Sequence, residues 1–134
     1  MSGEVFLDTN VLIYALGTDD PKRGRAQELL NAGGIISVQV LSEFVSVSRH
    51  KLKRGWQDIR EALALLNALL PDATPLTPEI HAQAVDLAEH FSFHIYDSLI
   101  VAAALKAKCS ILYTEDLQHG QKIEGLTIRN PFTS

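Results

Sequence analysis

The stretch at residues 4–16 reads EVFLDTNVLIYAL and joins a short β-prone run to the beginning of a helix. Residues 4–8 are apolar between their two acidic ends, which is typical of a short buried strand. The apolar residues that follow suit a short helix ending at Gly17. Asp8 stands between strand and helix, where a buried carboxylate costs free energy unless it has a partner. We therefore expect both the sheet and a polar site to be organised around Asp8.

The rest of the chain alternates short apolar runs with amphipathic or apolar segments of helical length. Further strands are predicted at 35–37, 110–113 and 126–128, and further helices at 21–33, after Ser37, at 57–70, 78–93 and 96–108. Strands separated by helices indicate βαβ units and a mainly parallel sheet. The sequence therefore predicts an α/β fold.

Composition narrows the function classes. The 134 residues include 12 Lys and Arg and 16 Asp and Glu, a net charge of −4 with neutral histidines, which argues against a nucleic-acid coat protein or a polybasic membrane binder. Charge is uneven, because residues 22–60 hold eight bases and three acids, whereas residues 61–134 hold four bases and nine acids. A local basic surface is thus compatible with the acidic total.

Cys109 is the single cysteine of the sequence, which excludes an intramolecular disulfide framework and a cysteine-cluster metal site. We expect it to be a small buried apolar residue. The sequence has no apolar run of about 18 residues, and its beginning, with Glu4 and Asp8, lacks the cationic start of a signal peptide. A soluble cytoplasmic protein is expected.

Four acids stand in apolar sequence at predicted strand ends or helix starts: Asp8, Glu43, Asp97 and Asp116. Taken singly, Asp97 reads as a helix cap or first-turn acid, Asp116 as a turn residue, and Glu43 as the exposed side of an amphipathic helix. Taken together, they are expected at the carboxyl edge of one parallel sheet, where ligands gather in such folds.

Four carboxylates at close range raise one another's proton affinity, and a divalent cation removes that conflict. Oxygen ligands favour Mg²⁺ or Mn²⁺ over zinc, and such an ion promotes water attack on a phosphodiester. Further hydrogen bonds that orient the acids are expected from Thr9, Asn10, Ser98 and Thr114.

A basic stretch, with Arg49, Lys51, Lys53 and Arg54, is the candidate surface for contacts to phosphate groups. A solvated helix end is an equal interpretation of these charges. Nearby Trp56 is expected in the core rather than stacked on an unpaired nucleobase. Lys22, Arg23 and Arg25 are candidates to extend this surface, and His94 is placed to approach the site from just before the Asp97 helix.

Four motifs occur in order along the chain: LDTNVLIY at 7–14, LSEF at 41–44, YDSLI at 96–100 and YTEDL at 113–117. Together they resemble the PIN domain, in particular the VapC-type toxins of bacterial toxin–antitoxin modules. The resemblance implies a single PIN-like domain over residues 1–134. That domain would have three α/β/α layers around a central, mainly parallel twisted sheet of four to five short strands.

The same resemblance implies a Mg²⁺- or Mn²⁺-dependent endoribonuclease in which Asp8, Glu43, Asp97 and Asp116 form the catalytic, metal-binding quartet. Asp8 and Asp97 would be the main metal ligands, and Thr114 matches a position that assists at the site. It also implies an RNA substrate, a homodimer and a small antitoxin protein that covers the groove.

Other readings of the acids fit less well. A phospho-accepting receiver domain needs an acidic pair after its first strand and a late lysine, and a haloacid-dehalogenase-type phosphatase needs Asp-x-Asp where this chain has Asp8-Thr9-Asn10. A catalytically silent PIN-like module that binds RNA or protein stays as the alternative. Retention of all four acids favours the nuclease.

Overall fold

The structure is a computed structural model that describes residues 4–18 and 21–133. A four-stranded sheet has the order β1-β4-β6-β5, and a two-stranded sheet pairs β2 with β3. The strands are β1 Glu4–Leu7, β2 Ile36–Ser37, β3 Ala73–Thr74, β4 Cys109–Tyr113, β5 Lys122–Ile123 and β6 Leu126–Arg129. The helices are α1 Thr9–Ala15, α2 Arg23–Ala32, α3 Val38–Ser46, the π-helical turn η1 Val47–Lys51, α4 Trp56–Leu69, α5 Pro78–Phe91 and α6 Ile95–Lys106.

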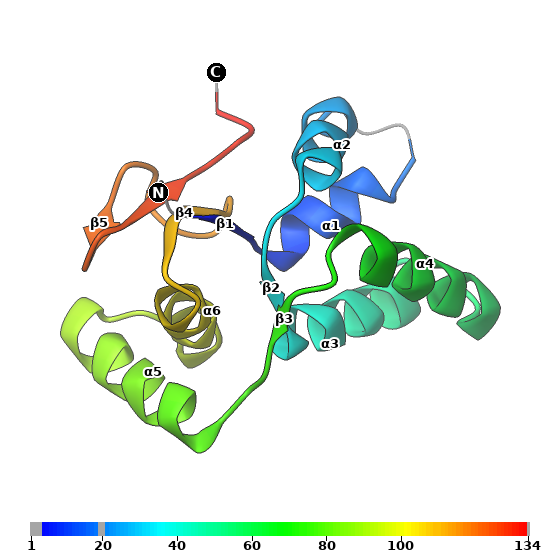
Figure 1. The fold of residues 1–134 in the computed structure, drawn as a ribbon. Helices are drawn as coiled ribbons and strands as arrows, with labels where there is room; N and C mark the ends of the chain where they lie inside the picture. Colours follow the sequence, from blue (N-terminus) through cyan, green and yellow to red (C-terminus); the bar gives the residue numbers. More distant parts are fainter. Residues whose placement is uncertain (1–3, 19–20, 134) are drawn as a thin grey trace.

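The central sheet is mainly parallel, as the alternation of strands and helices predicts. β1 pairs with β4 and β4 with β6 in parallel, and only the two-residue β5 is antiparallel among the described strands. Figure 1 shows α5 and α6 on one side of β1 and β4, and α1 and α2 on the other. The predicted α/β class and its layers are confirmed.

The second sheet joins the first through the segment that enters β2. The backbone N–H of Ile35 donates to Val5 O at 2.9 Å, and Leu7 N donates to Ile35 O at 3.0 Å. Gly34 makes this approach possible, since a Cβ there would lie 3.1 Å from Val5 O. β2 thereby ends beside the carboxyl end of β1, and α3 begins there.

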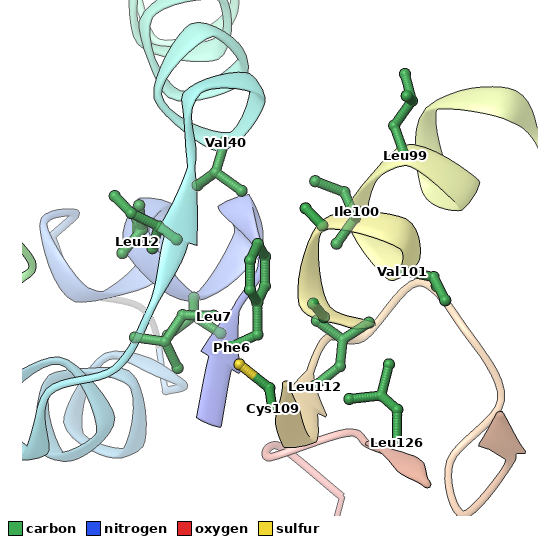
Figure 2. Packing of buried hydrophobic residues seen from close by; sticks show 14 of the residues in the cluster. Phe6, Leu7, Leu12, Val40, Leu99, Ile100, Val101, Cys109, Leu112 and Leu126 are labelled. Carbon is green, nitrogen blue, oxygen red and sulfur yellow. The ribbon is translucent and has the colours of Figure 1, made fainter. Parts of the chain in front are cut away.

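The hydrophobic core lies on both sides of β1 and β4. Phe6, Leu7 and Leu112 are fully buried. Figure 2 shows Phe6 and Leu7 with Leu12 and Val40 on one side and the residues of α6 on the other. α6 is buried from Ser98 to Ala104, which agrees with its almost wholly apolar sequence.

Helix boundaries follow the predicted signals closely. Ser37 caps α3 by accepting from Val40 N at 3.2 Å, and Thr77 caps α5 by accepting from Ile80 N at 3.2 Å, with Pro78 in the first turn. The helix expected from Pro21 begins at Arg23 instead. β3 and β5 were not predicted, because two-residue strands have no periodicity of their own.

Two single-residue predictions have opposite outcomes. Cys109 is buried in the core, as expected. The core prediction for Trp56 is wrong, because 49% of this residue is exposed at the beginning of α4. Its ring packs instead against the Arg49 guanidinium, 5.1 Å from the ring centroid. Within residues 4–18 and 21–133, no helix has the length and apolar character needed to cross a membrane.

Candidate active site

All four predicted acids line one groove of about 790 Å³, whose walls come from α1, α3, η1, the beginning of α6 and the loop after β4. We call the part around Asp8, Glu43, Asp97 and Asp116 the acid end. Sheet register explains the position of Asp8: Leu7 pairs with Tyr113, and Asp8 N donates to Tyr113 O at 3.0 Å. Asp8 and Thr114 therefore leave neighbouring parallel strands side by side.

Asp8 is the most enclosed of the acids, with 5% of its surface exposed. Its Oδ1 accepts from Thr9 N at 2.7 Å, and its Oδ2 accepts from the Thr114 hydroxyl at 2.8 Å. Burial raises the pKa of Asp8 to about 7; the two hydrogen bonds oppose that rise, and the charges of Asp116 and Glu43 add to it. A nearby cation would stabilise the ionised form of this buried carboxylate.

Glu43 reaches the groove from α3, after β2 has brought that helix beside β1. The Thr9 hydroxyl donates to Glu43 Oε1 at 2.7 Å, so that Thr9 touches two of the acids. The Gln39 amide donates to Glu43 Oε2 at 3.4 Å and to Tyr96 O at 3.1 Å. Gln39 thus links α3 to the beginning of α6.

Asp97 lies in the first turn of α6, which is capped by His94 rather than by Asp97. His94 Nδ1 accepts from Tyr96 N at 3.3 Å. Burial and the charge of Asp116 raise the pKa of Asp97, and His94 partly offsets this. His94 is therefore near the site, as its sequence position predicted.

Asp116 is the exposed member of the quartet. Asn10 Nδ2 donates to Asp116 Oδ2 at 3.2 Å, and Asp116 N donates to the Thr114 hydroxyl at 3.0 Å. Thr114 is buried and so ties Asp8 to the loop that carries Asp116. Ser98 is also buried, but its hydroxyl has no hydrogen-bond partner within the described ranges, so it does not orient an acid here.

The donor set is suitable for a hard divalent cation. The side chains at the acid end offer carboxylate, hydroxyl and amide oxygens as metal ligands. The buried Asn10 Oδ1 has no hydrogen-bond partner among the residues described. Also within that part of the chain, no three His, Cys, Asp or Glu side chains stand close enough to enclose an ion. Mg²⁺ needs no such cage, because it binds through one or two carboxylates and retains waters. The residues present therefore fit the ion.

The opposite end of the groove is basic. Lys51 and Arg54 line it, together with Gly17 and Thr18 at the far end of α1. Arg54 Nη2 donates to Leu16 O at 2.9 Å, which fixes this end one α1 length, roughly 10 Å, from Asp8. We call Lys51 and Arg54 the basic end. η1 supports it, since Leu52 N donates to Val47 O at 3.0 Å in a π-helical pattern that is frequent at functional sites.

The other predicted basic residues are placed differently. Arg49 donates to Arg54 O at 3.1 Å and packs on Trp56, so it supports the loop rather than the groove wall. Lys53 is exposed in a left-handed conformation (φ 59°). Lys22, Arg23 and Arg25 do not line the groove; Lys22 pairs with Glu115, and Arg25 with Glu28 at 3.6 Å.

The sequence did not predict the contacts that three residues make at the site. Gln39 could have been found from its position four residues before Glu43 on the same helix. Tyr14 and Lys22 bind Glu115, 101 and 93 residues away in sequence, and no local pattern signals such contacts.

Comparisons with known proteins bear on the family and the fold. The PIN domain family profile matches residues 5–122. No curated protein matches the chain in sequence. Among solved structures, VapC20 of Mycobacterium tuberculosis, a sarcin–ricin loop cleaving toxin, superposes with a TM-score of 0.69 at 21% identity, over 84% of this chain and 89% of that one.

Two further structures contain toxin–antitoxin proteins. A chain of a toxin–antitoxin complex from Klebsiella pneumoniae has a TM-score of 0.69 and 24% identity, over 96% of this chain and 98% of its own. A chain of VapBC2 from Rickettsia felis, bound to a DNA fragment from its promoter, has a TM-score of 0.65 and 22% identity, over 93% and 96%. At these identities the likeness establishes the shared fold.

Proposed function

Because the chain belongs to the PIN domain family, we propose that it is a metal-dependent endoribonuclease that hydrolyses RNA phosphodiester bonds, acting as the toxin of a toxin–antitoxin module. The observation that carries the proposal is the convergence of Asp8, Glu43, Asp97 and Asp116 on one groove. A protein that had lost nuclease activity would have no need for this arrangement, because a buried acid such as Asp8 destabilises the metal-free fold.

Asp8 and Asp97 would be the main ligands of Mg²⁺ or Mn²⁺, with Glu43 and Asp116 completing the quartet. When bound, the cation would supply Lewis-acid stabilisation of the charge that develops on the phosphodiester. Thr114 and Thr9 hold the Asp8 carboxylate from both oxygens, and Asn10 holds Asp116. These bonds fix the acids before substrate arrives, so that little reorganisation is needed in the reaction.

The basic end would bind RNA phosphates away from the cleaved bond. Lys51 and Arg54 face the groove and would position the backbone, while Lys53 and Arg49 add positive charge outside it. The exposed Trp56, supported by Arg49, offers a face on which an unpaired base can stack. The RNA would then run along α1 from the basic end to the acid end.

We also propose the partners that the family resemblance implies: a cognate antitoxin protein and a second copy of this chain in a homodimer. Two of the structural relatives are described as toxin–antitoxin assemblies, which supports an antitoxin for this chain. We propose the cytoplasm as the site of action, where an RNA substrate is available.

The test is incubation of the protein with total cellular RNA and Mg²⁺ or Mn²⁺, with the cut ends mapped by sequencing and Asp8→Asn as the control. Discrete metal-dependent cuts that disappear in the variant are expected. Binding of RNA without any cut, together with no Mn²⁺-dependent thermal shift, would support the silent binding module instead.

A further inference from the structure

Glu115 and Asp116 are adjacent acids on the loop after β4, and both line the groove, yet their surroundings differ. Asp116 is exposed and has the neutral Asn10 amide as its side-chain donor. Glu115 is bonded through both carboxylate oxygens: Oε1 to Lys22 Nζ at 2.7 Å and Oε2 to the Tyr14 hydroxyl at 2.7 Å. One acid of the pair is therefore neutralised and the other is not.

The contacts around Glu115 form a small cluster that crosses the fold. Lys22, just before α2, also lies 4.8 Å from the centroid of the Tyr14 ring and 5.5 Å from that of Phe132. The two rings pack edge to face at 5.1 Å. Residues of α1, of the segment before α2, of the loop after β4 and of the segment after β6 thus meet around Lys22. Its ammonium is held by the salt bridge to Glu115, a hydrogen bond to the Tyr14 hydroxyl at 3.3 Å and the two rings.

We infer that Lys22 and Tyr14 are positioning residues that hold the Glu115 carboxylate neutralised at the groove wall, so that Asp116 alone carries the charge of this loop into the acid end. This inference rests on the proposed function, because it assigns the cluster a role at the proposed metal site. Without the cluster, the carboxylates of two neighbouring side chains of different length would compete for the same cation.

Such a competition matters because the two side chains are not equivalent. Glutamate is one methylene longer than aspartate, so it delivers its carboxylate to a different point of the groove. Thr114 holds the Asp116 backbone and Asp8 together, whereas Glu115 is fixed to α1 and Lys22. The cluster therefore selects which acid of the pair acts, and it does so from outside the acid end.

The experiment measures the Mn²⁺ dissociation constant of the full chain by calorimetry in two backgrounds. In the wild-type background, Asp116→Asn is expected to weaken Mn²⁺ binding by about tenfold, and Glu115→Gln by about threefold or less. With Lys22→Met, this order is expected to reverse, because the released Glu115 takes the place of Asp116. Tyr14→Phe keeps the ring and removes the hydroxyl. It is expected to bring the Mn²⁺ dissociation constants of the two acid variants closer together without reversing their order.

Lys106→Met is the matched control, since it removes the same charge from the exposed last turn of α6 and should leave the wild-type order unchanged. An unchanged order of the two acid variants in the Lys22→Met background, or an unchanged ratio of their Mn²⁺ dissociation constants in the Tyr14→Phe background where Lys22→Met does not fold, would overturn the inference while leaving the nuclease proposal intact. Absence of Mn²⁺ binding by the wild-type chain, together with absence of Asp8-dependent RNA cleavage, would overturn both. Urea unfolding in EDTA checks that each variant folds, and Tyr14→Phe keeps the test available where Lys22→Met does not fold.

Discussion

The two ends of the groove are built in different ways. At the acid end, Asp8 is almost fully buried, and hydrogen bonds from Thr9 and Thr114 reach both of its oxygens. At the basic end, Lys51 is the last residue of a π-helical turn and is exposed, and Lys53 follows in a left-handed conformation. The acid end is fixed by sheet register, whereas the basic end is carried by a short π-helical segment that one hydrogen bond, from Arg54 to Leu16 O, joins to the end of α1.

This difference separates chemistry from recognition. Long-range contacts hold the acids in place regardless of what the groove contains, as preorganised catalysis requires. The exposed cations can adjust to a flexible backbone, and their interactions are screened by salt. Changes at the acid end should therefore act on metal binding and cleavage rate, whereas changes at the basic end should act on RNA affinity and its salt dependence.

The largest effect is expected from Asp8→Asn, which removes the most enclosed carboxylate while keeping its shape. RNA cleavage with Mn²⁺ should fall by about a thousandfold or more, as is typical when transition-state charge loses its stabilisation. RNA affinity, measured by filter binding in EDTA, should change by less than about threefold. Cleavage that survives this change would place the chemistry elsewhere in the molecule.

The second-largest effect is expected on the pH dependence of the free energy of unfolding of the metal-free protein. Because the pKa of Asp8 is raised to about 7 from 3.8, folding favours its protonated form. The stabilisation is complete below about pH 4 and is lost as pH rises through 7, which amounts to roughly 4 kcal/mol over the interval. Urea unfolding in EDTA at pH 5, 6.5 and 8 should show this loss.

Asp8→Asn is the control for that pH dependence, since it leaves other titrating groups in place. The variant should match the wild type below about pH 4, exceed it in stability by about 1 to 2 kcal/mol at pH 5, and exceed it by roughly 4 kcal/mol at pH 8. Mn²⁺ should recover the stability of the wild type at pH 8 and have little effect on the variant. Parallel pH profiles for the two proteins would mean that Asp8 is not held in this unfavourable state.

A third, smaller effect concerns the hydroxyl of Thr114, which orients Asp8 without being placed among the metal ligands. Thr114→Val should weaken Mn²⁺ binding by about 10-fold to 100-fold, and Thr114→Ser should restore it. Thr127→Val, on the neighbouring strand β6, is the matched control and should leave Mn²⁺ binding unchanged. Equal Mn²⁺ affinities for Thr114→Val and the wild type would show that the acid end does not depend on this bond.

Much of the acid end could be predicted from sequence because local and topological signals coincide there. Asp8 follows an apolar strand, Asp116 follows another, and parallel strands bring their carboxyl ends together. Ser37 and Thr77 gave the helix starts through ordinary capping chemistry. These signals lie within a few residues of the feature that they predict.

The remainder depended on contacts that a sequence pattern does not encode. Trp56 was expected in the core, but Arg49 provides a partner that keeps its ring at the surface. The binding of Glu115 by Lys22 and Tyr14 needs α1, the beginning of α2 and the loop after β4 to be assembled first. The assignment of Ser98 as a residue that orients the acids had only its position beside Asp97 in its favour, and its hydroxyl makes no hydrogen bond within the part of the chain that the structure describes.

The smallest expected effect comes from the exposed cations near the basic end. Lys51→Gln with Lys53→Gln should reduce the slope of log affinity against log salt by about 2 if each lysine neutralises one phosphate, and by about 1 if Lys51 alone does so. Arg54 is left in place because its bond to Leu16 O supports the loop. Lys106→Gln with Lys122→Gln removes the same charge from two exposed sites outside the groove and should leave the slope unchanged.

An unchanged slope in the Lys51→Gln, Lys53→Gln variant would remove the basic end from the RNA path. A reduced slope with an unchanged cleavage rate at saturating RNA would show that recognition and chemistry are separate along the groove, because the lysines would then contribute equally to the ground state and the transition state.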